Sequence, residues 1–194
     1  MAAWNCVNEF EKPSVCIVKH TNPCGVASDK DLENAYNKAF STDPTSAFGG
    51  VIALNQKADS KVISSIMANQ FVEVIIAPDF DQEVINLLKK KENIRVLKGD
   101  KFKHLTESYK YNSGVYLEQT DDNLNFEKIK LESNTKAKPD SNDINDLLFA
   151  MKVAKHVKSN AIVIARDEMT LGIGAGQMSR VISTKIAFMK AKEE

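Results

Sequence analysis

The sequence carries no net charge, because 26 Lys and Arg residues balance 26 Asp and Glu residues. A chain without net charge exerts no general attraction on DNA, RNA or an anionic membrane. We therefore expect no nucleic-acid partner and no membrane partner. Any anionic ligand must be held by a local cluster of basic side chains.

Cysteine is scarce as well. The three cysteines, Cys6, Cys16 and Cys24, are odd in number and irregular in spacing, which argues against a disulfide framework. Thiols that stay unpaired fit a reducing compartment. The N-terminal residues lack the basic-then-apolar pattern of a secretory signal, and no apolar run approaches the roughly 20 residues that span a bilayer. Together these absences predict a cytoplasmic protein.

A zinc site lacks its ligands. Zinc deaminases combine His-x-Glu with Pro-Cys-x-x-Cys, whereas here Ala27 follows Pro23-Cys24 at the second cysteine position and no His-x-Glu precedes it. The other histidines, His104 and His156, do not have metal-ligand spacing. We expect no zinc.

What the sequence does have is a hydrophobic content of 43%, enough to build a core. Short apolar segments predict strands at 15–18, 51–54, 71–77, 94–97, 161–165 and from 170, with a further edge strand at 111–117. Helical patterns occupy 31–40 (capped by Ser28 or Asp29), the segment capped by Ser60, 82–91, 144–157 and 178–192. This alternation predicts an α/β fold with a largely parallel sheet.

The stretch from 119 to 139 differs from its surroundings, because it is rich in Asp, Asn, Glu and Lys and its apolar residues are scattered. Such a composition fits an exposed crossing segment or hairpin. We expect a first lobe over 1–120, a connecting segment over 121–139 and the start of a second, incomplete lobe over 140–194.

Lys19 and His20 end an apolar strand and precede the turn residues Asn22, Pro23 and Gly25. In open α/β sheets, ligands gather at the carboxyl ends of strands. A histidine can move a proton near neutral pH, and a lysine can stabilise a developing oxyanion. The pair is a candidate catalytic site. The alternative is a surface strand end with two solvated cations.

A second candidate is the glycine-rich run Gly172–Arg180, where a strand leads through a turn into a helix. Glycines let the backbone approach a ligand, helix N-termini attract anions, and Arg180 suits a carboxylate or phosphate. Gln177 stands where a dinucleotide fingerprint needs glycine, which argues against a dinucleotide oxidoreductase. The alternative is a tight strand-to-helix connection.

Glu73 lies inside an apolar strand and is a third candidate, because a carboxylate there must be paired or exposed. An edge strand with Glu73 in water would explain it equally well. Asn160 at a strand start and the run Ser46–Gly50 are locally typical of turns.

Several blocks taken together resemble one family. Val18–Gly25, Asp43–Gly50, Phe71–Pro78, and Lys158–Asn160 followed by Gly172–Arg180 occur in a single order. They resemble the aminoimidazole-carboxamide ribonucleotide transformylase region of the bifunctional purine-biosynthesis enzymes of the PurH family. The resemblance covers nearly the whole chain, with 119–139 as its least distinctive part.

This resemblance implies a fold, a reaction and a partner. The family's transformylase region has two three-layer lobes similar to the cytidine deaminase fold without its zinc. The reaction transfers a formyl group from 10-formyltetrahydrofolate to the amine of the ribonucleotide, and the active sites form between the subunits of a homodimer. Some members hold potassium near the segment that matches 153–159.

The resemblance also implies roles for single residues. It assigns proton removal from the amine to His20 and transition-state stabilisation to Lys19. The family's nucleotide contacts fall on His20, Gly49, Glu73, Asn160 and Arg180, and a folate contact falls on Val181. Some members have Asp at the position of Glu73, which keeps the charge.

Large parts of the family's sequence have no counterpart here, namely the cyclohydrolase module and the opening and closing segments of the transformylase region. We therefore expect an incomplete piece of that region, which folds but catalyses poorly because contacts to both substrates are lost. The alternative is a non-catalytic folded core that dimerises.

Overall fold

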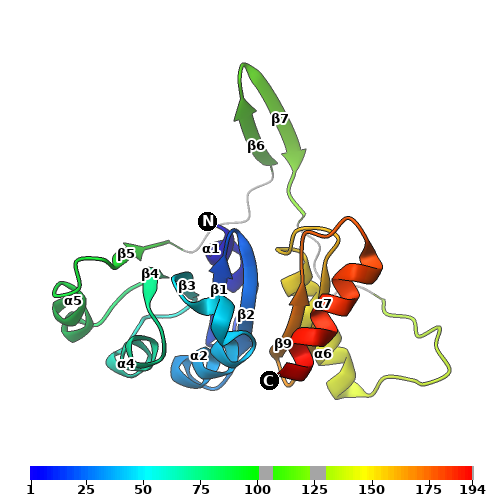
Figure 1. Ribbon diagram of the computed structural model, residues 1–194, viewed down its shortest axis with the longest axis horizontal. Coiled ribbons are helices and arrows are strands. Elements are labelled where there is room, and N and C mark those ends of the chain that lie inside the picture. Colours follow the sequence, from blue (N-terminus) through cyan, green and yellow to red (C-terminus); the bar gives the residue numbers. More distant parts are fainter. Residues whose placement is uncertain (101–106, 123–129, 194) are drawn as a thin grey trace. The chain divides into compact units, whose positions relative to one another are not determined.

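The computed structural model describes residues 1–100, 107–122 and 130–193 (Figure 1). The chain divides into two compact units, Met1–Gly99 with Pro139–Glu194, and Asp100–Lys138. The elements of the first unit are α1 (Ala2–Val7), β1 (Ser14–Lys19), β2 (Asn22–Ser28), α2 (Leu32–Ser41), α3 (Pro44–Ala47), β3 (Gly50–Leu54), α4 (Ser60–Asn69), β4 (Val72–Ala77), α5 (Gln82–Leu88), β5 (Arg95–Lys98), α6 (Ser141–Ala154), β8 (Ile162–Arg166), β9 (Met169–Gly174) and α7 (Arg180–Glu193). Those of the second unit are β6 (Glu107–Asn112) and β7 (Val115–Thr120).

The first unit is built on one seven-stranded sheet with the strand order β5-β4-β3-β1-β2-β9-β8. The pairs β3–β4 and β4–β5 are parallel, whereas β1 pairs antiparallel with β2 and β3, and β9 pairs antiparallel with β2 and β8. The prediction of an α/β fold is confirmed. The prediction of a largely parallel sheet is wrong, because the sheet is mixed.

Two tight hairpins make the sheet mixed. His20 and Thr21, with φ of 48° and 67°, join β1 to β2, and Asp167 and Glu168, with φ of 51° and 55°, join β8 to β9. A two-residue turn with positive φ at both positions matches the twist of antiparallel strands. The usual signal for such a turn is Asn-Gly or Asp-Gly, and neither turn here contains glycine, so hydrophobic periodicity did not reveal the hairpins.

The predicted turn over residues 21–25 is wrong beyond Thr21, because β2 begins at Asn22 and continues through Pro23. The register of β1 against β2 shifts at this point, and Cys24 is the extra residue of a bulge. Proline is tolerated in strands at bulges, where the ladder of backbone hydrogen bonds is interrupted.

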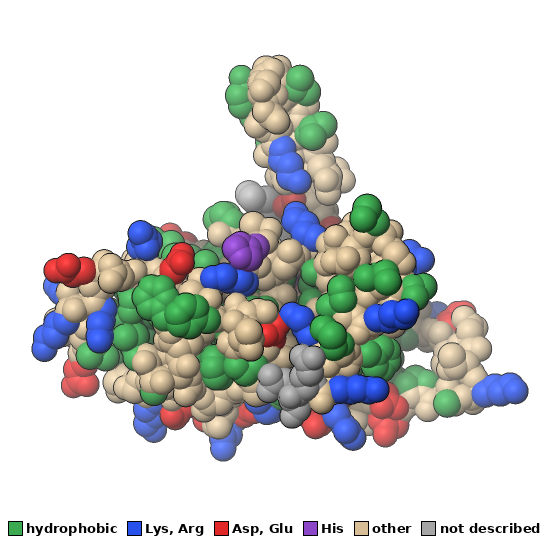
Figure 2. Space-filling model, in the orientation of Figure 1, with side chains coloured by type: hydrophobic (Ala, Val, Ile, Leu, Met, Phe, Trp, Pro, Cys, Tyr) green, Lys and Arg blue, Asp and Glu red, His purple; other side chains and the backbone are tan. Residues whose placement is uncertain are grey.

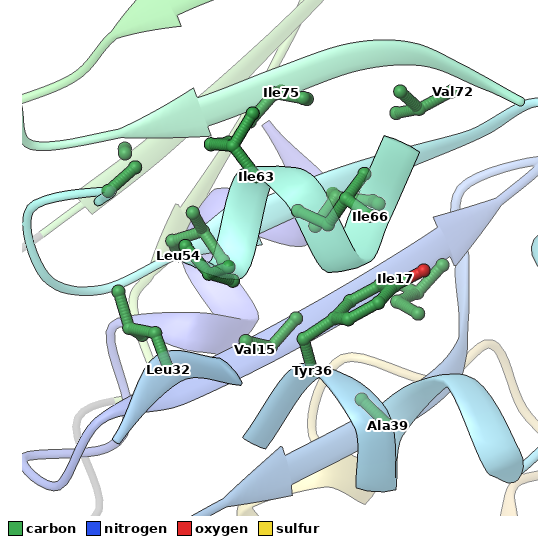
Figure 3. Packing of buried hydrophobic residues seen from close by; sticks show 14 of the residues in the cluster. Val15, Ile17, Leu32, Tyr36, Ala39, Leu54, Ile63, Ile66, Val72 and Ile75 are labelled. Carbon is green, nitrogen blue, oxygen red and sulfur yellow. The ribbon is translucent and has the colours of Figure 1, made fainter. Parts of the chain in front are cut away.

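Helices cover both faces of the sheet. On one face, α2 and α4 bury side chains such as Tyr36, Ile63 and Ile66 against the strands, and Figure 3 shows the two isoleucines between α4 and the sheet. On the other face, α1 and α6 contribute Trp4 and Phe149 to a second cluster. The apolar area removed from water on both faces is the main stabilising contribution to this unit.

Aspartates, rather than serines, cap the first two long helices. The Asp31 side chain accepts a backbone hydrogen bond in the first turn of α2, and the Asp59 side chain does so in α4. The predicted caps at Ser28 or Asp29 and at Ser60 are therefore wrong. A carboxylate at the N-cap satisfies an unpaired N–H and also interacts favourably with the helix dipole.

The second unit contains a hairpin of β6 and β7, which form a sheet of their own. Ser113 and Gly114, with φ of 50° and 85°, make the turn. The predicted edge strand at 111–117 is wrong, because that segment contains the turn. Tyr111 and Tyr116 are cross-strand partners with ring centroids 5.0 Å apart.

The predicted lobes over 1–120 and 140–194 stay a prediction. Strands from both ranges join the same seven-stranded sheet. Residues 123–129 of the predicted connecting segment lie outside the described residues. His104, which precedes that segment, lies outside them as well. Of the helices in the described ranges, none combines the length and apolar character needed to cross a membrane.

Glycines let α7 lie directly on β9. A Cβ added at Gly172 would be 2.1 Å from the carbonyl oxygen of Ala187, and one added at Gly174 would be 1.9 Å from that of Ser183. Backbone atoms cannot yield by changing rotamer, so a methyl group at either position would push the helix away from the sheet.

We predict that Gly174→Ala lowers the free energy of unfolding by about 3 kcal/mol, because the added methyl group overpacks the contact. The control is Gly176→Ala, where an added Cβ has nothing within 4 Å but φ is 67°; strain there should lower stability by only about 1 kcal/mol. Guanidinium denaturation of the 194-residue chain measures both changes. Equal losses would contradict the close contact.

Candidate functional site

Lys19 ends β1 and is half-buried. Its ammonium donates hydrogen bonds to the carbonyl oxygens of Phe48 and Gly49, both at 2.9 Å. The cation at the end of this apolar strand is therefore held in place rather than left to rotate in solvent.

Gly49 makes this arrangement possible. Its φ is 65°, and its N–H donates to the carbonyl of Phe71 at 2.8 Å. A Cβ at this position would be strained and would lie 3.0 Å from the Lys19 Nζ. Glycine thus lets the loop turn two carbonyl groups toward the ammonium.

Glu73 approaches the same place from β4. The register of β3 against β4 shifts after Gly50, and Glu73 has no paired residue on β3. One of its carboxylate oxygens lies 3.6 Å from the position of a Cβ on Gly49. β4 lies inside the sheet, so an edge strand does not explain this exposed carboxylate. The bulge does, since bulges redirect side chains and are frequent beside active sites.

Phe48 and Phe71 present aromatic rings beside this loop. They are 63% and 44% exposed, and their ring centroids are 5.7 Å apart. Both border an open hollow of about 690 Å³, which is also lined by parts of 67–72 and 90–94. Exposed aromatic rings at the edge of a hollow suit a flat, partly apolar ligand.

His20 occupies the turn that follows Lys19 and is exposed. A positive φ is uncommon for residues other than glycine, and such strained backbone clusters at functional sites. Because β1 ends at Lys19, the alternation of a pleated strand no longer forces the two side chains to opposite faces. Lys19 and His20 thus lie at one sheet end, and their catalytic roles stay a prediction.

The β1–β2 turn is also tied to the glycine-rich loop before α7. The side-chain oxygen of Asn22 accepts a hydrogen bond from the backbone N–H of Lys158 at 2.9 Å. The carbonyl of Lys158 in turn accepts from the N–H of Gly176 at 2.7 Å. Blocks that are far apart in the sequence therefore meet beside His20.

Asn160 fixes the last residues of that loop. Its side-chain amide donates to the carbonyls of Gln177 and Met178, at 2.9 and 3.0 Å. Arg180 begins α7 and is exposed, and Val181 is 64% exposed. The structure thus gives Asn160 a loop-holding role, while ligand contacts by Asn160, Arg180 and Val181 stay predictions.

Three residues that take part in this arrangement were not singled out as site candidates from the sequence. Asn22 and Phe71 lie inside blocks that resemble the family, and Lys190 lies outside every block. In the last turn of α7, Lys190 forms an ion pair with Asp43. Burial alone would raise the pKa of the Asp43 carboxyl, but hydrogen bonds from Lys190 and Ser46 outweigh it and hold the pKa below its ordinary value of 3.8. The carboxylate is therefore charged at neutral pH.

Within the ranges that the structure describes, no three His, Cys, Asp or Glu side chains are grouped so that they could hold a metal ion. Cys24 is buried, and burial raises the pKa of its thiol to about 12. A protonated thiol is a poor metal ligand and a poor nucleophile.

The segment 153–159, where the resemblance implies potassium, is held by its own turn. The carbonyls of Val153 and Ala154 accept backbone hydrogen bonds from His156 and Val157. A potassium ion near this segment stays a prediction, and we derive no step from one.

Two comparisons with known proteins agree. The family model described as the AICARFT/IMPCHase bienzyme matches residues 1–190. Over 99% of its length, the chain is 48% identical to the bifunctional purine biosynthesis protein PurH of Xanthomonas oryzae pv. oryzae (strain KACC10331 / KXO85) and of Xanthomonas axonopodis pv. citri (strain 306). It spans only 37% of the length of these relatives. The chain belongs to the AICARFT/IMPCHase bienzyme family.

Proposed function

We propose that this chain carries part of the centre that transfers a formyl group from 10-formyltetrahydrofolate to the amine of aminoimidazole-carboxamide ribonucleotide, a step of purine (IMP) biosynthesis. The observation that carries the proposal is the Lys19 ammonium, which the carbonyls of Phe48 and Gly49 hold beside His20. Membership of the bienzyme family supports the same reaction.

The two carbonyls leave Lys19 one donor. An ammonium has three N–H groups, and the carbonyl oxygens of Phe48 and Gly49 accept hydrogen bonds from two of them. The third has a direction fixed by the other two, and we assign it to the oxygen that becomes negative during transfer. A donor that is already oriented stabilises an oxyanion without reorganising at the moment of reaction.

The reaction needs a base as well. The amine nitrogen attacks the formyl carbon, a C–N bond forms, and the formyl oxygen takes up negative charge. His20 removes one proton from the attacking amine, and this proton passes to the folate nitrogen as its bond to the formyl carbon breaks. The products are the formylated ribonucleotide and tetrahydrofolate, with protons and electrons in balance.

Anion recognition falls to the loop before α7 in this proposal. Arg180 lies at a helix N-terminus, where the backbone and a forked guanidinium both favour a phosphate. Gly49, Glu73 and Asn160 complete the nucleotide contacts, and Val181 contacts the folate.

The proposal includes two three-layer lobes similar to the cytidine deaminase fold, in a cytoplasmic homodimer whose subunits share the active sites. Its support is a sheet covered by helices on both faces, together with a repeated local pattern. Both β1 and β8 end on a basic residue, Lys19 and Arg166, and continue through a tight turn into an antiparallel partner.

A non-catalytic dimerisation core is the second candidate, and the surface of α7 favours it. Val181, Phe188 and Met189 are 64%, 54% and 51% exposed, and Figure 2 shows hydrophobic side chains at the surface over this helix. Apolar side chains gathered on an exposed helix are typical of a face that another protein segment covers.

We predict that Lys19→Met and His20→Gln each lower kcat for formyl transfer by about a hundredfold or more, because one removes the oriented donor and the other the base. The control is Lys61→Met, which removes an exposed cation from α4. Formation of tetrahydrofolate measures the rate, and circular dichroism checks the fold.

Three outcomes would contradict this assignment. Unchanged transfer rates in both variants would remove the roles of Lys19 and His20. A chain that closes the ring of the formylated ribonucleotide, with no transfer, would move the function to the cyclohydrolase reaction. A chain that dimerises in sedimentation but does not bind the ribonucleotide in calorimetry would establish the dimerisation core instead.

A further inference from the structure

Asp43 and Lys190 form an ion pair that no motif predicted. The side chain of Asp43 is only 10% exposed and that of Lys190 is 28% exposed. A second oxygen of Asp43 accepts a hydrogen bond from the backbone N–H of Ser46 at 2.9 Å, so the same carboxylate caps α3. Removing one partner of a shielded pair leaves the other charge uncompensated, and the pair therefore has a strong preference to stay together.

The short helix α3 connects this pair to the Lys19 site. The N–H of Ala47 donates to the carbonyl of Asp43 at 3.0 Å, which closes the single turn of α3. The next two residues, Phe48 and Gly49, supply the carbonyls that hold the Lys19 ammonium. The cap and the two acceptors thus belong to one continuous loop.

The loop has little freedom on its other side. A Cβ added at Gly50 would lie 2.8 Å from the carbonyl of Ala47 and 3.2 Å from that of Val18, so the loop already lies against β1. The N–H of Gly49 is bound to the carbonyl of Phe71. What remains to be fixed is the start of the loop, and Asp43 lies there.

We propose that the Asp43–Lys190 pair is a positioning element, which fixes the start of the loop whose carbonyls aim the Lys19 ammonium. This inference rests on the proposed transfer reaction for its catalytic consequence, but not for its structural part. Lys190 and Asp43 touch no substrate in it. They act through the carbonyls of Phe48 and Gly49.

The test compares Lys190→Met, Asp43→Asn and Lys190→Arg in the 194-residue chain. Asn remains a good N-cap, so Asp43→Asn removes the charge of the pair while keeping the hydrogen bond to Ser46. Lys190→Arg is the conservative variant that should restore the pair. The matched control is Lys155→Met. Lys155 lies at the end of α6 and forms an ion pair with Glu9, whose carboxylate is comparably shielded.

The first readout is amide hydrogen exchange by NMR, which does not depend on activity. In Lys190→Met, we expect exchange of the Gly49 amide to rise about tenfold relative to that of Ile52 in β3, which corresponds to about 1.4 kcal/mol. Lys190→Arg and Lys155→Met should leave this ratio within about twofold. An unchanged ratio in Lys190→Met, or an equal rise at Ile52, overturns the inference.

The second readout is formyl transfer. We expect Lys190→Met and Asp43→Asn to lower kcat by about tenfold with a smaller change in KM, because Lys19 acts in the transition state. A faster Gly49 exchange with unchanged kcat overturns the positioning role. The proposed function has a separate test. If Lys19→Met and His20→Gln leave the rate of formyl transfer unchanged, the proposed function fails, whatever the exchange ratio of Gly49 to Ile52 shows.

Discussion

The half-buried ammonium of Lys19 is the constraint on which the rest of the site depends. A cation at the end of an apolar strand must find acceptors, and here they are the carbonyls of Phe48 and Gly49. Carbonyls can turn toward β1 only if the loop takes a positive φ, which Gly49 provides. The loop in turn needs a fixed start, which the capping carboxylate of Asp43 supplies. The roles of Phe48, Gly49 and Asp43 in this loop thus all follow from the need to hold the Lys19 ammonium.

Much of the fold could be predicted from hydrophobic pattern. The strands β1, β3 and β4 are short apolar runs, and α2, α4 and α7 have apolar residues at helical spacing. The sequence therefore indicates these strands and helices. The direction of the strands was not visible. It depends on two turns, His20-Thr21 and Asp167-Glu168, whose positive φ is imposed by the packed strands around them and not by glycine or asparagine. His20 and Asp167 are residue types that tolerate a positive φ without requiring it, so the local sequence did not decide the direction of the strands.

The candidate site divides in the same way. The motifs and the family resemblance picked out Lys19, Gly49 and Glu73, and the structure brings these three together around one loop. What the sequence could not indicate is how each arrives there. Glu73 reaches the loop through a bulge, and a register shift has no sequence signature of its own. Lys190 is 147 positions from Asp43, and a lysine in the last turn of a helix is usually explained by the helix dipole alone.

The direct contact between β9 and α7 has a mechanical consequence. Because the helix rests on the sheet through backbone atoms at Gly172 and Gly174, no compliant layer of side chains lies beneath it. A helix of 14 residues is about 20 Å long, and its backbone contacts with the two glycines extend from Ser183 to Ala191. The helix is therefore seated along most of its length, so that Arg180 at its start and Lys190 near its end keep fixed positions relative to β9.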